Sequence, residues 1–433
     1  MKKPVTLAIL GAGKRGEAYA DYAKKHPDLA KVVAVAEPRE FQRNRLASQH
    51  GVKAPNVFKS WEDLAGKPQL ADAVLICTQD RMHIEPALSF APKGYAMLLE
   101  KPMSPSLEEC ERIVACVKKH GNLFAVCHVL LYTEFTQKLK EVLEKGLIGE
   151  VVSMQHMEAV GWWHQAHSFV RGNWRNEHES SFMLLAKSCH DMDWMRHVMG
   201  KHCLRVASFG NLRHFKASER PDGAADRCLD CSIEKTCPYS AKRFYLDQFG
   251  RDWIIDYCVD VITSDHTPEG VTKALRQGPY GRCVYSCDND VVDNQVVNLE
   301  FEGPSTANFL MTAFTPTLHR QTRLFGTRGY IEADSVKINV FDFLTEKSTT
   351  YDTSVDPNSA TAASGHGGGD YHLMKAFVEA VSTGDQRKVW SGPDASLESH
   401  RIVFAAEMAR RQNRVVEMDE LARSAAKSVA RHI

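Results

Sequence analysis

The sequence has no surplus of charge of either sign and no long run of apolar residues. Lysine and arginine together number 54, as do aspartate and glutamate, so the formal net charge is zero. A neutral chain offers little electrostatic attraction to a nucleic-acid backbone or an anionic membrane. No stretch approaches the roughly 18 consecutive apolar residues of a membrane-spanning helix. We therefore expect no nucleic-acid partner and no membrane association.

The amino terminus also lacks the features of a secretory signal. The apolar run that follows the first lysines extends only from Val5 to Leu10 before a glycine-rich segment begins, and this is too short for the hydrophobic part of a signal peptide. We expect a cytoplasmic protein. In that compartment the twelve cysteines would be reduced core residues or metal ligands rather than disulfides.

What the sequence does contain is typical of a globular protein with more than one domain. Hydrophobic residues make up 43% and charged residues 25% of the chain, which indicates neither disorder nor a coiled coil. Domains usually hold about 100–200 residues, so 433 residues are enough for two hydrophobic cores.

A glycine-rich turn between a strand and a helix gives the first indication of function. The β-forming run Val5–Leu10 ends at Gly11-Ala-Gly-Lys-Arg-Gly16, and a helical pattern extends from Lys14 to Lys25. In a nucleotide-binding turn, the first glycine permits the bend, the second lets a pyrophosphate approach, and the third lets helix and strand pack closely. We assign this motif to cofactor binding, through Gly11, Gly13, Lys14, Arg15 and Gly16, although taken alone it also fits an incidental turn.

An acidic residue follows the next strand at a spacing typical of NAD-binding proteins. Glu37 comes directly after the predicted strand 31–36, about 20 residues beyond the turn, where a carboxylate can bind the ribose hydroxyls. A carboxylate at this place repels a 2′-phosphate, which favours NAD. Arg39 could bind that phosphate instead, so NADP remains an alternative.

Helices and strands keep alternating through the first third of the chain, which is typical of a doubly wound parallel sheet. The predicted strands are 57–58, 73–77, 95–99 and 123–127, and the predicted helices are 40–50, 83–91 and 106–120. Ligands of such sheets bind beyond the carboxyl ends of the strands. We therefore expect the loops after two of these strands to face the cofactor, and we assign Thr78, His83, Glu100 and Lys101 to its site.

These motifs together resemble the Gfo/Idh/MocA (glucose–fructose oxidoreductase / inositol dehydrogenase / MocA) family of oxidoreductases. The most specific mark is the tripeptide Glu100-Lys101-Pro102 at the end of a strand. The resemblance extends to a linking helix at 132–148, the start of a sheet at 149–152 and a strand pair around 326–332.

The resemblance implies an α/β protein with two domains. A Rossmann domain with a doubly wound parallel sheet would occupy residues 1–127. An α+β domain with a large, open-faced, mostly antiparallel sheet would occupy residues 128–433 and bind the substrate. Because this sheet often mediates oligomers in the family, we expect a homo-oligomer, a dimer or a tetramer.

The resemblance also implies which residues act on the substrate. In the family, the lysine of the tripeptide and a histidine on a helix of the second domain contact the reacting hydroxyl, and Lys101 and His190 take these places here. Asp193 would share a helical face with His190 and could orient its imidazole. Many members carry an aspartate four residues before the histidine, where this chain has Ala186 beside Lys187. The assignment of proton transfer therefore stays open.

The segment 161–175 concentrates three tryptophans, two histidines and two arginines. Indole faces stack on the C–H faces of sugars, and arginine and histidine bind hydroxyls or carboxylates. We expect this segment to line a substrate pocket, with the contacts supplied by Trp162, Trp163, His164, His167, Arg171 and the separate Lys187. An aromatic packing loop or a subunit interface is the alternative.

Three closely spaced cysteines stand in a polar insertion at about residues 211–290. Cys228, Cys231 and Cys237 form a C-x2-C-x5-C pattern that suits one tetrahedral ion if a fourth thiolate, Cys283 or Cys287, joins them. We favour a structural zinc site completed by Cys283. An iron–sulfur cluster and unmetallated thiols are the alternatives.

Near the end of the chain, the glycine-rich tract 365–369 precedes a predicted helix at 371–381. We interpret the tract as a hinge rather than a phosphate-binding turn. Asp370 and His372 lie close enough to the start of the helix to reach the pocket.

Taken together, the sequence predicts an NAD(P)-dependent oxidoreductase that transfers a hydride to or from a hydroxyl or keto group of a small carbohydrate: a sugar, a polyol or a derivative. One alternative is a glycosidase that uses NAD to oxidise the sugar transiently and eliminate the aglycone. The other is a non-catalytic NAD-binding sensor.

Overall fold

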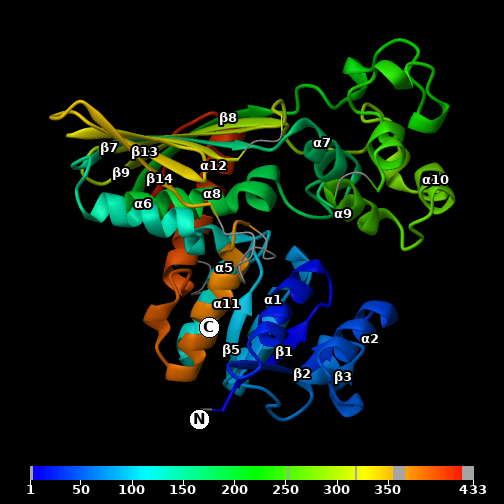
Figure 1. The fold of residues 1–433 in the computed structure, drawn as a ribbon, viewed down its shortest axis with the longest axis horizontal. Helices are drawn as coiled ribbons and strands as arrows, with labels where there is room; N and C mark the ends of the chain where they lie inside the picture. Colours follow the sequence, from blue (N-terminus) through cyan, green and yellow to red (C-terminus); the bar gives the residue numbers. More distant parts are fainter. Residues whose placement is uncertain (1–2, 251–252, 317–318, 355–365, 422–433) are drawn as a thin grey trace.

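Two β-sheets organise the computed structural model, which describes residues 3–250, 253–316, 319–354 and 366–421 (Figure 1). The first sheet is parallel, has the strand order β3-β2-β1-β4-β5-β6, and contains the first six strands of the chain. Its strands are β1 (Val5–Leu10), β2 (Ala30–Ala36), β3 (Val57–Phe58), β4 (Ala73–Ile76), β5 (Ala96–Leu99) and β6 (Phe124–Val126). This order is that of the Rossmann fold, so the predicted doubly wound sheet is confirmed.

Helices cover both faces of the parallel sheet. The connecting helices are α1 (Lys14–Lys25), α2 (Glu40–Gln49), α3 (Trp61–Ala65), α4 (Ile84–Phe90) and α5 (Leu107–His120). Strand residues alternate between two buried clusters: Ile9 and Leu98 pack on the side of α1, and Leu10 and Leu99 pack on the side of α4 and α5. Because the central strands are buried on both faces, they are almost continuously apolar.

The second sheet has nine strands in the order β14-β13-β12-β11-β7-β10-β9-β8-β15. Neighbouring strands run antiparallel except β7 and β10, which confirms the expected mostly antiparallel sheet. The strands are β7 (Val151–Ala159), β8 (Cys203–Asn211), β9 (Asn294–Phe301), β10 (Ser305–Thr312), β11 (Gln321–Gly326), β12 (Gly329–Ala333), β13 (Lys337–Asp342), β14 (Lys347–Asp352) and β15 (Val416–Glu417). Helices α6 (Glu134–Glu144) and α8 (Met183–Met199) lie under one face of this sheet (Figure 1).

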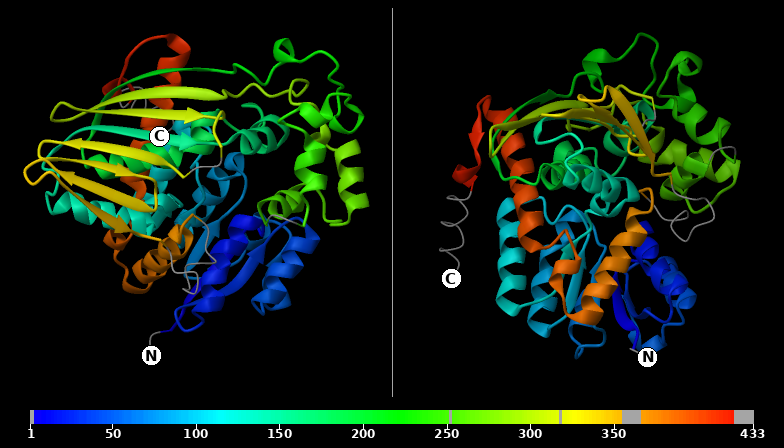
Figure 2. Two further views of the ribbon diagram at one scale, coloured as in Figure 1. Left: turned by 45° about the horizontal axis from the view of Figure 1, so that its top comes forward. Right: turned by 60° about the vertical axis from the view of Figure 1, so that its left-hand side comes forward.

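The insertion between β8 and β9 forms a separate lobe (Figure 2). It carries the helices α9 (Trp253–Ile262) and α10 (Pro268–Gln277), several single-turn helices, and two small apolar clusters of its own. A short helix, α7 (Trp162–His164), and the π-helical segment Gln165–Arg171 connect the lobe to the second sheet. The lobe lies above α1 and α2 in Figure 1.

The last two long helices return from the second sheet to the first domain. Helix α11 (Gly369–Thr383) packs against α1 and against the 3₁₀ turn η4 (Val129–Tyr132), while α12 (Pro393–Gln412) packs against α5, α8 and β8. The two sheets are therefore joined by shared helices. The predicted division at residue 127/128 stays a prediction.

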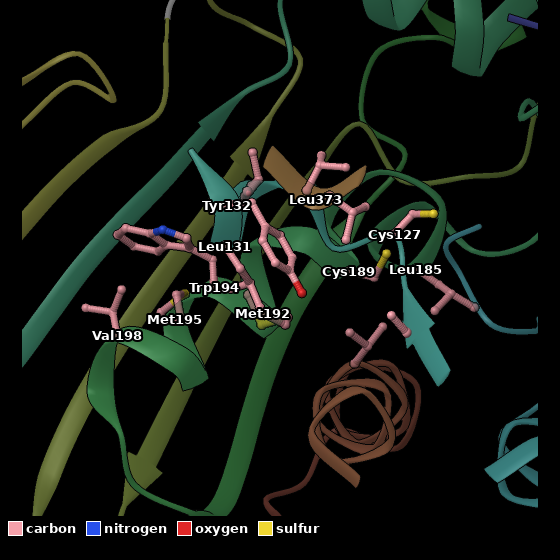
Figure 3. Close-up of a cluster of buried hydrophobic side chains, with 14 of the residues drawn as sticks. Cys127, Leu131, Tyr132, Leu185, Cys189, Met192, Trp194, Met195, Val198 and Leu373 are labelled. Carbon is pink, nitrogen blue, oxygen red and sulfur yellow. The ribbon is translucent and has the colours of Figure 1, made fainter. Parts of the chain in front are cut away.

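A continuous apolar core fixes α8 between the two domains (Figure 3). Side chains from the end of β6, from η4, from α8 and from α11 meet there; those drawn include Cys127, Leu131, Tyr132, Leu185, Cys189, Met192, Trp194 and Leu373. The Trp194 indole donates a hydrogen bond to Thr136 Oγ1 at 2.9 Å. Because α8 is buried along almost its whole surface, residues on this helix are held rigidly.

None of the helices within the described ranges combines the length and the apolar character needed to cross a membrane.

Candidate active site at the edge of the parallel sheet

The glycine turn is shaped to leave room for a ligand at one position only. Gly11 has φ +90° and an added Cβ would lie 2.5 Å from the carbonyl oxygen of Cys77, while a Cβ at Gly16 would overlap the carbonyl oxygen of Gly11. A Cβ at Gly13 would meet only the guanidinium of Arg39, at 3.6 Å. Gly13 is also the N-cap of α1, and its helix start has no side-chain cap. The open space and the helix start without a side-chain cap fit a pyrophosphate.

Glu37 closes this turn from the end of β2. Its carboxylate accepts a hydrogen bond from the backbone N–H of Ala12 at 2.8 Å and two from the Arg39 side chain at 2.7 and 3.0 Å. Burial opposes ionisation of Glu37, but the hydrogen bonds from Arg39 and Ala12 outweigh it and lower its pKa. The position fits the ribose of a bound dinucleotide.

Arg15 and Glu100 are engaged with other protein groups. The buried Glu100 carboxylate accepts hydrogen bonds from Arg15 Nε and from the Tyr19 hydroxyl, both at 2.6 Å, and from the Lys101 backbone N–H at 2.9 Å. Arg15 also pairs with Asp370 on α11 at 2.6 Å. This network ties the glycine turn to the loop that carries Lys101, so Arg15 and Glu100 position the site.

His83 performs a similar task for the loops after β4 and β5. It is fully buried, and its two ring nitrogens lie 2.8 Å from the carbonyl oxygen of Pro102 and 3.1 Å from that of Thr78. The Thr78 hydroxyl donates to the Met82 carbonyl. On the other side of the turn, Lys14 forms an ion pair with Asp260 of the insertion.

The structure brings Lys101 and His190 together beyond the carboxyl end of the parallel sheet. Lys101 Nζ donates a hydrogen bond of 2.8 Å to the carbonyl oxygen of Ala186, one helical turn before His190 on α8. Burial, followed by the positive charge of Lys101, lowers the pKa of His190 well below its usual value. His190 is therefore a neutral imidazole at physiological pH, able to accept a proton.

Two further histidines border His190, and sequence analysis missed both. The ring centroid of His128 lies 5.9 Å from that of His190, as does the ring centroid of His366. His366 Nδ1 lies 3.3 Å from a carboxylate oxygen of Asp370. Asp193, expected to orient His190, instead lies closest to His128 among the histidines, with 3.9 Å between Asp193 Oδ2 and His128 Nδ1.

A buried network of ion pairs extends from α8 to the second sheet. Arg320 pairs with Asp191 and, at 3.0 Å, with Glu158, and Lys187 also pairs with Glu158 at 3.0 Å. Lys187 was predicted for the substrate pocket, and the other three were missed. No pattern in the sequence points to Arg320 as a residue of the site, because it stands far along the chain from His190. Asp191 could have been predicted, because it directly follows His190 in the sequence.

The aromatic segment divides between the site and the insertion. His164 is close enough to the site that, after burial, the charge of Lys187 is the main cause that lowers its pKa. Trp163 stacks between His164 and Phe244, with ring centroids 5.3 and 5.5 Å away, and Trp162 packs against Tyr239.

His167 and Arg171 point toward the insertion. His167 Nδ1 lies 2.7 Å from the Tyr245 hydroxyl. Arg171 donates to the carbonyl oxygens of Arg282 and Tyr239 at 2.7 and 2.8 Å and to Cys228 Sγ at 3.5 Å. In the structure, these two side chains hold the lobe, and their predicted contact with a substrate stays a prediction.

The predicted zinc site finds no support in the geometry. Cys228, Cys231, Cys237 and Cys283 do line one small cavity, together with Arg171. Across the described parts of the chain, however, no group of three or more histidine, cysteine, aspartate or glutamate side chains is arranged to hold a metal ion. All twelve cysteines are unbridged.

A Rossmann domain with an open glycine turn, joined to a second domain whose helix α8 contributes a buried histidine and whose sheet contributes ion pairs, defines a dinucleotide-dependent redox protein of two domains. Comparison with known families agrees. Residues 5–128 match the NAD-binding Rossmann fold of the oxidoreductase family Gfo/Idh/MocA, and residues 140–418 match its C-terminal alpha/beta domain. The chain therefore belongs to the Gfo/Idh/MocA family.

Individual relatives are distant. The chain is 26% identical over 211 residues to the 2,7-anhydro-N-acetylneuraminate hydratase of Escherichia coli, an alignment that covers 48% of this chain and 54% of that protein. It is also 26% identical over 215 residues to the myo-inositol 2-dehydrogenase of Thermotoga maritima, with 48% and 58% covered. The chain thus spans little more than half the length of these relatives.

A solved structure matches nearly the whole chain. Levoglucosan dehydrogenase in complex with NADH and levoglucosan superimposes with a TM-score of 0.70 at 17% identity, covering 96% of this chain and all of that one. At this identity the match concerns the fold.

Proposed function

We propose that this protein is an NAD-dependent oxidoreductase that transfers a hydride between the cofactor and a hydroxyl-bearing carbon of a sugar, a polyol or a derivative. One observation carries the proposal: Lys101 and His190 lie close together beyond the carboxyl end of the parallel sheet, at the same end as the glycine turn. Family membership and the dehydrogenases among the relatives support the same chemistry.

Each group at the site has a task in this reaction. The N–H groups at Gly13 and the start of α1 would hold the pyrophosphate, and Glu37 would hold the ribose. When bound, NAD supplies the hydride acceptor. His190 takes the proton of the substrate hydroxyl as the carbon is oxidised, and Lys101 donates a hydrogen bond to the same oxygen and stabilises its developing negative charge. Lys187, which pairs with Glu158 at 3.0 Å, would bind a further hydroxyl of the substrate.

NAD is favoured over NADP because of the Glu37–Arg39 pair. Both oxygens of Glu37 are occupied by Arg39 and Ala12, and the charged carboxylate would lie against a 2′-phosphate. Such a juxtaposition of like charges disfavours binding of the phosphorylated cofactor.

A second candidate is transient oxidation followed by elimination, in which NAD is reduced and reoxidised within one turnover. The specific observation in its favour is His366, a second imidazole 5.9 Å from His190 with Asp370 beside it, which a simple hydride transfer does not require. A relative named as a hydratase supports this possibility.

A substrate screen distinguishes the two. The protein is mixed with NAD and each of myo-inositol, D-glucose, levoglucosan, a D-glucoside and 2,7-anhydro-N-acetylneuraminate, with absorbance at 340 nm and product chromatography recorded together. Steady accumulation of NADH supports the dehydrogenase. Product formation without net NADH supports transient oxidation, and the absence of both for every compound contradicts the proposed function.

The structural zinc site stays a proposal that spacing supports and that the arrangement of side chains does not. Burial raises the pKa of the Cys237 and Cys283 thiols, although each accepts a backbone hydrogen bond from the tyrosine two residues on. Elemental analysis of the purified protein decides: about one zinc per chain supports the site, and under a tenth of an equivalent contradicts it.

A homo-oligomer formed through the open face of the second sheet is proposed on similar terms. Phe209, Val296, Leu310 and Met157 are paired across β8, β9, β10 and β7 and form an apolar row that is half-exposed or exposed. Light scattering in solution tests this, and a monomer would contradict it.

The unbridged cysteines support the cytoplasm as the place of action.

A further inference from the structure

A buried histidine behind His190 has no function in the scheme above. His128 follows β6 at the carboxyl end of the parallel sheet and is 1% exposed. Its ring lies between those of His190 and His400, with centroid separations of 5.9 and 5.6 Å. Asp193 Oδ2 lies 3.9 Å from His128 Nδ1.

The polar atoms of this cluster are unusually poorly paired. Among the described residues, neither ring nitrogen of His128 nor His190 Nδ1 has a hydrogen-bond partner that meets distance and angle criteria. The Asp193 carboxylate has none of that quality either, and its ion pair with Arg196 is a longer one, at 3.6 Å. Leaving such a group buried and unpaired costs about 1–3 kcal/mol. A core that served packing alone would use apolar side chains here, so the polar groups point to a function.

The fourth member of the cluster is already fixed. His400 donates from Nδ1 to the Ser396 carbonyl oxygen at 2.7 Å, and its Nε2 accepts from the Met103 N–H at 3.0 Å. With both nitrogens occupied, His400 holds the loop after Lys101. Of the two histidines that border His190, His366 is paired with Asp370. Within the buried cluster, the groups left to exchange a proton with His190 are therefore His128 and, beyond it, Asp193.

We propose that His128 and Asp193 form a proton relay that serves His190 during the redox step. The inference rests on the proposed function and deepens it. The relay also explains how the site could work with Ala186 at the position where many family members carry an aspartate, four residues before the histidine. In the relay, the carboxylate of Asp193 takes the place of that aspartate and acts through His128. One bound water or a small ring rotation joins the nitrogens at these separations, as is common when a site tightens around its substrate.

The proton balance of the relay is as follows. The substrate O–H bond breaks and an N–H bond forms at His190 Nε2, while His190 releases the proton of its Nδ1 to His128. His128 in turn releases the proton of its other nitrogen to Asp193. The hydride leaves the carbon with its electron pair to NAD. Both histidines end as neutral tautomers and Asp193 ends protonated, and the reverse shift returns the proton to water once product has left.

The charges around the cluster suit this exchange. Burial opposes the charged forms of both partners: it lowers the pKa of His128 to about 3 and raises the pKa of Asp193. The groups that face His128 are Arg196, Lys101 and Glu100, and those that face Asp193 are Arg196, His197, Ser399 and His400. Neutralising Asp193 by a transferred proton is therefore less costly than protonating either histidine in place.

The test uses His128→Ala and Asp193→Asn in the full-length protein with NAD and the best substrate of the screen. We expect kcat to fall roughly 10- to 100-fold, within the range of acid–base effects, with KM and NAD affinity unchanged. Added imidazole should restore much of the activity of His128→Ala by entering the vacated space, and it should leave Asp193→Asn unaffected. His214→Ala, which removes a half-buried histidine in the insertion, is the matched control and should behave as wild type.

Two results overturn the relay. One is wild-type kcat and an unchanged pH profile in both variants. The other is lost activity in His128→Ala that imidazole does not restore while thermal unfolding shows a destabilised fold, because a structural role then explains the loss. Activity of Lys101→Ala, measured beside them, separates failure of the relay from failure of the proposed function.

A second measurement is independent of turnover. With ¹⁵N-labelled histidine and bound NAD at neutral pH, the relay predicts that His190 and His128 are coupled neutral rings, so Asp193→Asn should change the ring ¹⁵N shifts, and hence the tautomers, of both. Ring ¹⁵N shifts of the two histidines that are unaffected by Asp193→Asn contradict the relay even if no substrate is found.

Discussion

At the scale of single residues, the site depends on two side chains that come from different domains. Lys101 is held by the Glu100 network and by the carbonyl oxygen of Ala186, and His190 is kept neutral by burial beside that lysine. In the proposed mechanism, the positive charge that would stabilise an oxyanion also keeps the proposed base deprotonated, so the two roles would support each other.

Replacement of Lys101 by alanine should therefore remove activity but not cofactor. We expect kcat to fall at least about 100-fold, as for the loss of one donor to a developing oxyanion, with NAD affinity within a factor of about three measured by calorimetry. Lys93→Ala, which removes a surface lysine of the same domain, is the control. Retained activity in Lys101→Ala would remove this residue from the mechanism.

Cofactor choice should respond to Glu37. In Glu37→Ser, the loss of ribose hydrogen bonds should weaken NAD binding by roughly tenfold or more, and Arg39, released from its ion pair, should improve binding of NADP. Adding Arg39→Ala should cancel the gain for NADP. Calorimetric titration with both cofactors measures this, and an unchanged ratio of the two affinities would show that Glu37 does not face the ribose.

Sequence analysis predicted Glu37 because it directly follows a strand, and Lys101 and His190 because the tripeptide after a strand and a helical histidine resemble the positions of the family. His128 also directly follows a predicted strand at the same edge of the sheet, so this rule could have found it. Arg320 and Glu158 could not have been found, since only the assembly of the second sheet brings them beside α8.

At the scale of elements, different glycines of the turn between β1 and α1 serve folding and cofactor binding. Gly11 and Gly16 are required because a Cβ would collide with the backbone, whereas the space at Gly13 is open. Gly11→Ala should therefore lower the free energy of unfolding by about 2 kcal/mol or more through strain and collision.

Gly13→Ala is the informative counterpart. It should unfold at nearly the wild-type temperature and bind NAD at least roughly tenfold more weakly, a loss of about 1.4 kcal/mol. Scanning calorimetry with and without NAD measures both quantities. Equal NAD affinity in Gly13→Ala and wild type would place the pyrophosphate elsewhere.

Most strands and helices of the first domain were predicted within one or two residues, because regular alternation and apolar runs report them directly. The insertion was not predicted in detail. Its helices are short and its apolar clusters are small, so tertiary contacts such as Arg171 with Tyr239 decide its form more than local pattern does. The spacing of cysteines along the sequence predicted a metal site, but this spacing does not determine the distances between the sulfur atoms in the folded protein.

At the scale of the whole molecule, burial keeps several histidines neutral. It lowers the pKa of His128 and His400 to about 3, that of His167 to about 4, and that of His190 well below its ordinary value. The unfolded chain, in which these groups titrate near 6.5, binds protons first as the pH falls. Folding stability is therefore fully present above about pH 6.5 and is lost as the pH falls toward about 4.

The temperature of unfolding should accordingly drop steeply between pH 7 and pH 5. Each of these histidines contributes up to about 1.4 kcal/mol per pH unit in that range. Scanning fluorimetry of the cofactor-free protein across pH 5–8 measures the slope. An unfolding temperature that stays level between pH 7 and pH 5 would show that these histidines are not buried neutral.

The central claim is that NAD on this domain accepts a hydride from a carbohydrate at Lys101 and His190, and isotope transfer tests it most directly. The protein is incubated with NAD and perdeuterated D-glucose or myo-inositol, and the nicotinamide is analysed by mass spectrometry. The account predicts one deuterium on the ring of the NADH that wild type forms in net oxidation, or on the ring of the enzyme-bound cofactor quenched during turnover in transient oxidation, and none with Lys101→Ala. A nicotinamide that binds tightly yet gains no deuterium from any carbohydrate of the screen in perdeuterated form would contradict it.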